Sequence, residues 1–429
     1  MARQMKDSGI EWIGEIPVDW SMKRVKHIFT RKNEKVMQEN PTILSLARDG
    51  VKVRDISNNE GQIAESYYNY NPVEKGDLLL NPMDLYSGAN CSISKVQGVI
   101  SPAYINLRAN AGINPTFYDY YFKVQYWLMV FFSYGKGVSY DNRWTLSAET
   151  LMNYPVVALS YEEQCKRANY LDRKCAQIDA IISKQQQIIE KLKEYKLSVI
   201  TEAVTKGLDP NVPMKDSGID FIGSIPETWR ICRLRNIGTL QNGISKGGEF
   251  FGHGFPFVSY GDVYRNFSLP VQVAGLIDSS DEERRNYSVE SGDIFFTRTS
   301  ETIEEVGFSS VCEETIPDAT FAGFLIRVRP FTDDLVSKFS KYYFRSNHHR
   351  YYLVKQMNLV TRASLGQDLL KSMPVLVPPK DEQISIAAYL DKKCGAIESS
   401  IEYKQRVIER LTAYKKSLIY EVVTGKKEV

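Results

Sequence analysis

The sequence has few of the features that mark membrane, secreted or metal-binding proteins. No apolar run approaches the roughly 20 residues of a membrane-spanning helix, and the opening MARQMKDSG lacks the apolar core of a signal peptide. The six cysteines are scattered without a CxxC pair, and the four histidines show no helical metal-ligand spacing. These absences predict a cytoplasmic protein without a zinc site or a disulfide framework.

The chain also lacks an excess of one charge and the motifs of nucleotide chemistry. Its 54 basic residues nearly balance 52 acidic ones, so net charge neither requires nor excludes a nucleic-acid partner. No GxxxxGK(S/T) loop is present, so ATP binding is unsupported. Two loose methyltransferase patterns, FFGHG at 250–254 and NPMD at 81–84, fall in different halves and in inverted order. One pocket could hardly use both, and methyltransferase chemistry is not predicted in this chain.

What the chain does contain is a long internal repeat. Residues 163–205 return as residues 382–424, with about half the positions identical at a shift of 219 (382 minus 163). Apolar positions in each copy alternate in steps of four and three, which is the heptad pattern of a coiled coil with one polar interruption. The predicted seam residues are Leu171, Cys175, Ile178, Ile182, Gln185, Ile189 and Leu192 in the first copy, and Leu390, Cys394, Ile397, Ile401, Lys404, Ile408 and Leu411 in the second.

The order of the segments predicts that the two helices are antiparallel. The first helix carries the chain away from one body, so a second helix that packs on it must run back. At 1.5 Å per residue each helix spans roughly 60 Å, with a globular body expected at each end. The two seam cysteines are expected to be small buried hydrophobes rather than reactive thiols.

A second repeat precedes each body. Residues 5–20, MKDSGIEWIGEIPVDW, return as residues 214–229, MKDSGIDFIGSIPETW. We call residues 21–155 the first body and residues 230–374 the second body; they share only short marks, such as Val-Glu-x-Gly-Asp. Short β-rich runs broken by Gly, Asn and Pro predict a mixed α/β fold for each. The expected divisions are 1–155, 156–213, 214–374 and 375–429, with pseudo-two-fold symmetry that suits a partner with two half-sites, such as DNA.

The chain resembles the specificity (S) subunits of type I restriction-modification systems. The resemblance rests on the order body, helix, body, helix, on the repeated MKDSGI opening, and on the PVVALSYEEQ and PVLVPPKDEQ segments before the helices. It implies a non-catalytic DNA-binding subunit whose two α/β target recognition domains each read half of a bipartite, asymmetric site. An antiparallel coiled coil would set the gap between the halves.

The resemblance also implies partners and cofactors. Two methyltransferase (M) subunits would use S-adenosylmethionine to methylate adenine, and restriction (R) subunits would use ATP and Mg for cleavage. No cofactor is expected on this chain. The alternative from another class is an adaptor whose two bodies bind other proteins.

DNA contact requires cations for phosphate and side chains that reach base edges. We predict such contacts from the early basic run and the late loop GKGVSYDNRW of the first body, and from the early loop and scattered arginines of the second. The candidates are Lys23, Arg24, Arg48, Lys52, Arg54, Lys136, Tyr140, Asn142, Arg143, Lys246, His253, Arg265, Arg298 and Arg362.

The stretch KYYFRSNHHRYYLVK at 341–355 is expected to form a helix packed on the sheet, with its basic side exposed. Four of its residues could then face phosphate: Arg345, His348, His349 and Arg350. All four histidines of the chain, which also include His27 and His253, are expected at surface or loop positions.

Overall fold

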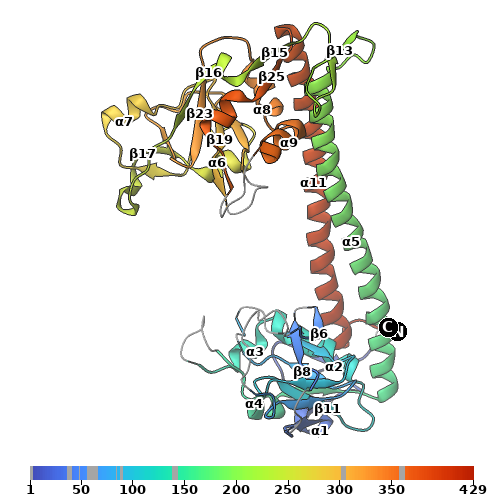
Figure 1. Ribbon diagram of the computed structural model, residues 1–429. Coiled ribbons are helices and arrows are strands. Elements are labelled where there is room, and N and C mark those ends of the chain that lie inside the picture. Colours follow the sequence, from blue (N-terminus) through green and yellow to red (C-terminus); the bar gives the residue numbers. More distant parts are fainter. Residues whose placement is uncertain are drawn as a thin grey trace. The chain divides into compact units, whose positions relative to one another are not determined.

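The computed structural model of the chain (Figure 1) describes residues 3–35, 41–47, 49–55, 66–83, 85–86, 90–137, 144–300, 306–356 and 363–429. It divides into two compact units: unit 1 comprises residues 1–185 and 406–429, and unit 2 comprises residues 186–405. Each unit therefore contains one body together with a segment of each long helix. Among the described residues, no helix is both long and apolar enough to cross a bilayer.

The first body is built on a four-stranded antiparallel sheet with the strand order β4-β11-β8-β9. Its strands are β4 (Phe29–Lys32), β8 (Leu78–Leu80), β9 (Cys91–Ile93) and β11 (Ile105–Ala109). Helix α2 (Pro115–Trp127) packs against β9 and buries its aromatic side chains in the core. It begins at Asn114, whose side chain accepts hydrogen bonds from the next free backbone N–H groups.

Shorter elements complete the first body and its flanks. They are β1 (Met5–Asp7), β2 (Glu15–Pro17), β3 (Ser21–Arg24), α1 (Val25–Ile28), β5 (Leu44–Ala47), β6 (Gly50–Val53), β7 (Asn71–Val73), β10 (Gly98–Ile100), α3 (Val130–Ser133), α4 (Ala148–Asn153) and β12 (Pro155–Ala158).

The second body repeats the sheet with the order β16-β23-β19-β21. These strands are β16 (Gly238–Asn242), β19 (Ile294–Thr297), β21 (Ser309–Val311) and β23 (Leu325–Pro330). The body adds a small sheet in which β17 (Phe251–Val258) pairs antiparallel with β18 (Leu276–Ile277) and parallel with β22 (Thr320–Phe321). An apolar cluster of its own supports this sheet. The two bodies thus share a scaffold and differ in what is attached to it, and the mixed α/β fold predicted for each is confirmed.

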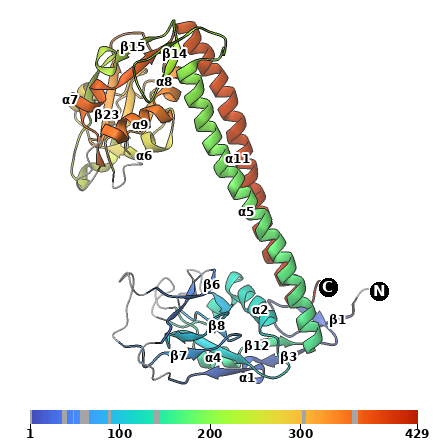
Figure 2. The same ribbon diagram turned by 45° about the vertical axis from the view of Figure 1, so that its right-hand side comes forward.

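The other elements of unit 2 surround these sheets (Figure 2). They are β13 (Met214–Asp216), β14 (Ser224–Pro226), β15 (Arg230–Arg233), η1 (Leu234–Asn236), η2 (Gly248–Phe250), α6 (Tyr260–Arg265), α7 (Asp281–Asn286), β20 (Thr299–Ser300), α8 (Ser337–Tyr343), α9 (Asn347–Gln356), β24 (Ala363–Ser364), α10 (Gln367–Ser372) and β25 (Pro374–Val377).

Each body is closed at its base by a two-stranded ladder. β3 pairs antiparallel with β12, which leads directly into the first long helix, and β15 pairs in the same way with β25. A tryptophan that ends the MKDSGI repeat lies just before each ladder, and Trp20 and Trp229 are almost fully buried. The repeated opening therefore joins the two ends of each body, and the expected boundary at residue 155 falls at the start of β12.

The two long helices are α5 (Tyr161–Lys206) and α11 (Lys380–Val423). All the expected seam residues are buried or partly buried, whereas Gln177 and Lys184 between them are exposed. Each helix ends before a glycine with positive φ, Gly207 or Gly425, because the left-handed conformation after a helix favours a residue without Cβ.

The antiparallel direction is visible inside each unit. In unit 1, Lys415 of α11 donates to Asp179 of α5 at 2.6 Å, and in unit 2, Lys196 of α5 pairs with Glu398 of α11. The two ion pairs are related by the repeat, since a shift of 219 converts Asp179 to Glu398 and Lys196 to Lys415. The pseudo-two-fold coiled coil predicted from the sequence is therefore confirmed.

Candidate DNA interface

A buried aspartate organises the edge of each sheet. In the Val-Glu-x-Gly-Asp marks, Asp77 and Asp293 each accept a hydrogen bond from the backbone N–H three residues earlier, which closes the turn before a central strand. Asp293 also holds Arg329 of the neighbouring strand at 2.6 Å, and Arg108 makes the equivalent contact with Asp77. These hydrogen bonds raise the pKa of both arginines. The Val-Glu-x-Gly-Asp motif shared by the two bodies therefore has a structural role in the scaffold.

The first body does not bring its predicted DNA contacts onto one surface. Lys23 and Arg24 are exposed on β3 next to α1, whereas Lys52 is exposed on β6. Figures 1 and 2 show α1 and β6 on opposite sides of this body. Arg54 is partly buried just after β6, and Lys136 is exposed before the late loop.

The partners of these side chains also differ. Arg24 donates to Asn153 and Lys52 pairs with Asp49, whereas Lys23 and Lys136 have no side-chain hydrogen bond or ion pair to the described residues. Four further candidates, Arg48, Tyr140, Asn142 and Arg143, lie outside the described residues.

In the second body some of the predicted DNA-binding side chains are already paired, and others are available to bind a phosphate. Lys246 is held by Glu283 and by the backbone oxygen of Asp278, both at 2.7 Å, and this hydrogen bond lowers the pKa of Glu283. His253 on β17 and Arg265 at the end of α6 are exposed and make no side-chain hydrogen bond to the described residues.

Two backbone hydrogen bonds hold Arg298 in position. Its N–H donates to Phe324, and its carbonyl accepts from Leu365. Its partly exposed guanidinium is not paired with any residue that the structure describes. Arg362 lies outside those residues.

The expectation for residues 341–355 was wrong in two respects. The stretch forms two helices, α8 and α9, separated by a break at 344–346. Arg345 is buried, and its guanidinium donates to four backbone oxygens, those of Ser309, Val263, Tyr264 and Asn266. It therefore stabilises the body and does not face phosphate. The aromatic residues Tyr342, Tyr343 and Phe344 are core, as predicted, whereas Tyr351 is 54% exposed.

His348 and His349 are also buried, contrary to the surface positions expected for them. They are 5% and 2% exposed, and each Nδ1 lies within 3.0 Å of the hydroxyl of Ser346. Burial lowers the pKa of His348 to about 3 and that of His349 well below its usual value. Arg350 is partly buried and donates to the backbone oxygen of Val306. His27 and His253 are exposed, as expected.

The EEQ and DEQ segments join each body to its helix. Gln164 accepts a hydrogen bond from the N–H of Asn114 and donates to Leu159, and Gln383 accepts from the N–H of Val336 and donates to Pro378. Both glutamines are almost completely buried. Each amide thus links the start of a body helix to the chain that leads into the coil. The sequence marked these positions by repetition without revealing their role.

A tyrosine to aspartate bond makes a second repeated joint. Tyr120 donates to Asp172, and Tyr342 donates to Asp391, both at 2.8 Å. The two aspartates are the repeated YLD residues of the long helices. A body that is tied to its helix by a buried amide and a tyrosine is held in a defined orientation to that helix.

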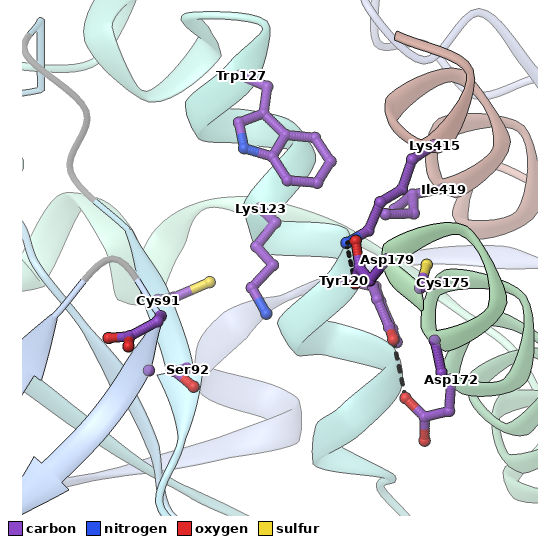
Figure 3. Close-up of a pocket in the computed structure, with 13 residues that line it drawn as sticks. Cys91, Ser92, Tyr120, Lys123, Trp127, Asp172, Cys175, Asp179, Lys415 and Ile419 are labelled. Carbon is purple, nitrogen blue, oxygen red and sulfur yellow. Dashed lines mark hydrogen bonds and ion pairs between the residues drawn. The ribbon is translucent and has the colours of Figure 1, made fainter. Parts of the chain in front are cut away.

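A pocket of about 500 Å³ lies in unit 1 between α2, β9 and the long helices (Figure 3). Lys123 reaches into it and pairs with Asp119 at 2.6 Å. Burial raises the pKa of both Cys91 and Cys175, so these thiols remain protonated and are poor nucleophiles. The same cause raises the pKa of Cys394 to about 11, consistent with the small buried hydrophobes expected on the seam. Among the described residues, no group of His, Cys, Asp and Glu has the arrangement of a metal site.

Comparison with known proteins agrees with this architecture. Residues 226–410 match the family described as "Type I restriction modification DNA specificity domain". The chain is 22% identical over 349 residues to the type I restriction enzyme StySPI specificity subunit of Salmonella potsdam, covering 80% of this chain and 69% of that protein. It is 22% identical over 433 residues to the MjaVIII specificity subunit of Methanocaldococcus jannaschii, covering 96% of this chain and 94% of that protein.

Two solved structures share the fold. A chain from a study of complex assembly and conformational transition of the type I R-M system superposes with a TM-score of 0.71 at 15% identity, covering 96% of this chain and 99% of that one. The HsdS subunit from Thermoanaerobacter tengcongensis gives a TM-score of 0.52 at 14% identity, covering 96% and 98%.

Two sheet bodies on one scaffold, each tied to a pair of antiparallel helices, are the fold that this chain shares with those solved structures. The family match over residues 226–410 and the relatives support the assignment of this chain as a type I restriction-modification specificity subunit. The resemblance found in the sequence is confirmed, and the adaptor alternative is not favoured.

Proposed function

We propose that each body reads one half of a bipartite, asymmetric DNA site, that the paired helices set the gap, and that two M subunits dock on the chain. S-adenosylmethionine would be bound by the M subunits, and ATP with Mg by R subunits where these take part. This chain would contribute sequence recognition and no catalytic group, and it would act in the cytoplasm, where the DNA is.

The shared sheet with different attachments is the observation that carries the proposal. The strand orders of the two sheets correspond one to one, and both bodies meet their helices through the same glutamine and tyrosine contacts. Function on a common scaffold resides in its loops, and the loops of the two bodies differ in length and sequence. Two bodies of this kind suit two different half-sites.

The experiment is to map adenine methylation in a host genome after co-expression of this chain with its M subunit. We expect a two-part motif with a fixed gap, altered in only one half when residues 21–155 are exchanged for those of a relative. A complex that is intact and loaded with cofactor, yet adds no new methylation, would contradict the proposal and favour an adaptor.

A further inference from the structure

The second body gathers side chains from distant parts of the sequence at one edge of its main sheet. β16 ends at Asn242, β19 ends at Thr297, and β23 begins at Leu325. Because β16 and β19 both pair antiparallel with β23, these three strand ends lie at the same edge. Arg298 and Phe324 follow directly beyond it, where the N–H of Arg298 donates to the backbone oxygen of Phe324 at 2.9 Å.

A glutamine of α10 joins this edge. α10 packs against β16, and the side-chain Nε2 of Gln367, the first residue of the helix, donates to Oδ1 of Asn242 at 3.0 Å. A glutamine amide has two N–H donors and an acceptor oxygen. The second N–H and Oε1 of Gln367 have no hydrogen-bond partner among the described residues, and the side chain is only partly buried. The bond to Asn242 therefore holds the amide in place while one donor and one acceptor stay available.

The equivalent edge of the first body shows which side chains the scaffold does not need. The N–H of Leu365 donates to the backbone oxygen of Arg298 at 2.7 Å, and the N–H of Leu146 donates to that of Pro82 at 2.8 Å. The backbone contact is thus the same in both bodies, with Pro82 in the place of Arg298. A proline side chain carries no charge and no donor, so the guanidinium is added to an unchanged backbone.

Gln367 is an addition of the same kind. The shift of 219 that relates Leu146 to Leu365 makes Ala148, the first residue of α4, the equivalent of Gln367. The first body therefore forms its sheet and its helix with an alanine at this position. The amide bond to Asn242 is not a requirement of the fold.

Phe324 differs between the bodies in the same way. When the strand registers are counted from Asp77 and Asp293, Ala103 is its equivalent in the first body. Phe324 is 64% exposed, so packing of the core does not explain its ring. An arginine, an amide and an aromatic ring thus meet at an edge where the first body has a proline and two alanines.

The free groups of Gln367 match the major-groove edge of adenine. Adenine presents the acceptor N7 and the donor N6 there, and one glutamine amide can bind both. Guanine presents two acceptors at the same place, which leaves the amide oxygen without a donor. The neighbouring Arg298 supplies a positive charge for a phosphate, and Phe324 supplies an apolar surface for the methyl group of thymine.

We propose that Gln367 reads an adenine in the half-site of the second body, that Asn242 positions its amide, and that Arg298 binds a neighbouring phosphate. The inference rests on the proposed function, which gives each body a half-site but assigns no residue to a base. An amide that is already held in place loses less conformational entropy when it binds, so Asn242 favours recognition without touching the base. The first body, with Ala148 and Pro82 at these positions, reads its half-site through other side chains.

The test uses the complex of the full chain with its M subunit, and duplexes that carry the motif found by methylation mapping. The half of the motif that is kept when residues 21–155 are exchanged belongs to the second body. Each adenine of that half is replaced in turn by 7-deazaadenine, which lacks the N7 acceptor. At one adenine we expect this replacement to weaken binding by the wild-type complex about 2- to 12-fold, as the loss of one hydrogen bond predicts.

The same replacement should have no effect on the Gln367→Ala complex, because the donor to N7 is already absent. That variant should also lose about 5- to 150-fold of the preference for A·T over G·C at this position. Asn242→Ala should reduce the sensitivity to 7-deazaadenine without abolishing it, because the amide is no longer held but can still bind.

Asp368→Ala is the matched control. Asp368 is the next residue of the same helix, its side chain is 99% exposed, and it pairs with Lys371 of α10 itself. This variant should keep the wild-type sensitivity at every adenine. Because alanine occupies the equivalent position of the first body, Gln367→Ala should fold, and an unchanged thermal unfolding temperature checks this.

The outcomes separate this inference from the function on which it rests. If the wild-type complex methylates a bipartite site, but wild type and Gln367→Ala respond equally to every replaced adenine, the assignment of Gln367 is wrong and the proposed function stands. If Gln367→Ala binds all duplexes more weakly by the same factor, Gln367 contacts the DNA backbone and the inference also fails. If the intact wild-type complex adds no methylation, the proposed function itself fails.

Discussion

Mild acid should destabilise the second body through His348 and His349. Both rings are buried, and no acidic side chain is hydrogen-bonded to them among the described residues. Burial lowers the pKa of His348 in the folded body to about 3. Between pH 6.5 and 3, the ring is therefore protonated in the unfolded chain and neutral in the folded one. The free energy of unfolding of the second body is therefore highest above pH 6.5, as far as this histidine is concerned, and falls as the pH decreases toward 3. From pH 6.5 to 4.5 we expect a loss of about 2 kcal/mol from His348 alone, with His349 acting in the same direction.

The assay is urea denaturation read by pulse proteolysis, with peptides from the second body detected by mass spectrometry. The variant His348→Gln with His349→Gln removes both titrating groups, so its free energy of unfolding should change less between pH 6.5 and 4.5. The control is His27→Gln with His253→Gln, which removes two exposed histidines and should keep the wild-type dependence. Equal pH dependence in the two double variants would refute the reasoning.

Three further predictions concern the coil, the joints and the DNA contacts. Inserting one helical turn into both α5 and α11 should change the gap in the methylated motif and leave the half-sites alone; an unchanged gap would contradict the spacing role. Gln164→Leu or Gln383→Leu should each lower the free energy of unfolding by about 1–3 kcal/mol, because a buried N–H loses its acceptor; urea midpoints check this against the exposed control Gln177→Leu, which should have little effect. Arg298→Ala should weaken DNA binding and reduce its salt dependence by about one phosphate contact, whereas Lys246→Ala should act on stability, since Lys246 is already paired; equal effects of the two on the salt slope would count against this distinction.

Repetition made the architecture predictable. The heptad steps gave the helix faces, and the order of the segments gave their direction, because both depend on local spacing and chain connectivity. The cysteines on the seam followed from the same pattern. Residue type alone served less well for the sites. Arg345, His348 and His349 look like a basic patch in the sequence, but the break between α8 and α9 turns them inward, where Arg345 donates to backbone oxygens and Ser346 contacts the Nδ1 atom of each histidine.

The missed residues share a physical reason. Gln164 and Gln383 act through contacts with chain about 50 residues away, and no local pattern encodes such a contact. The residues that contact DNA were equally difficult to predict from the sequence, because the sequence does not distinguish a lysine in an ion pair from an unpaired one. Lys246 and Lys136 were equivalent candidates until the structure showed Glu283 beside the first of them.

The discontinuity of unit 1 has a consequence for synthesis on the ribosome. Unit 2 is a continuous segment, whereas unit 1 needs residues 406–429, which follow unit 2 in the chain. The buried guanidinium of Arg167 shows the dependence, since it donates to the backbone oxygens of Val422 and Lys427. Although the first body emerges first, the part of its apolar cluster that α11 contributes, which includes Leu418 and Ile419, is missing until α11 has been made. The nascent chain therefore carries an incomplete apolar cluster through the whole translation of unit 2, a period in which chaperone binding would protect it from aggregation.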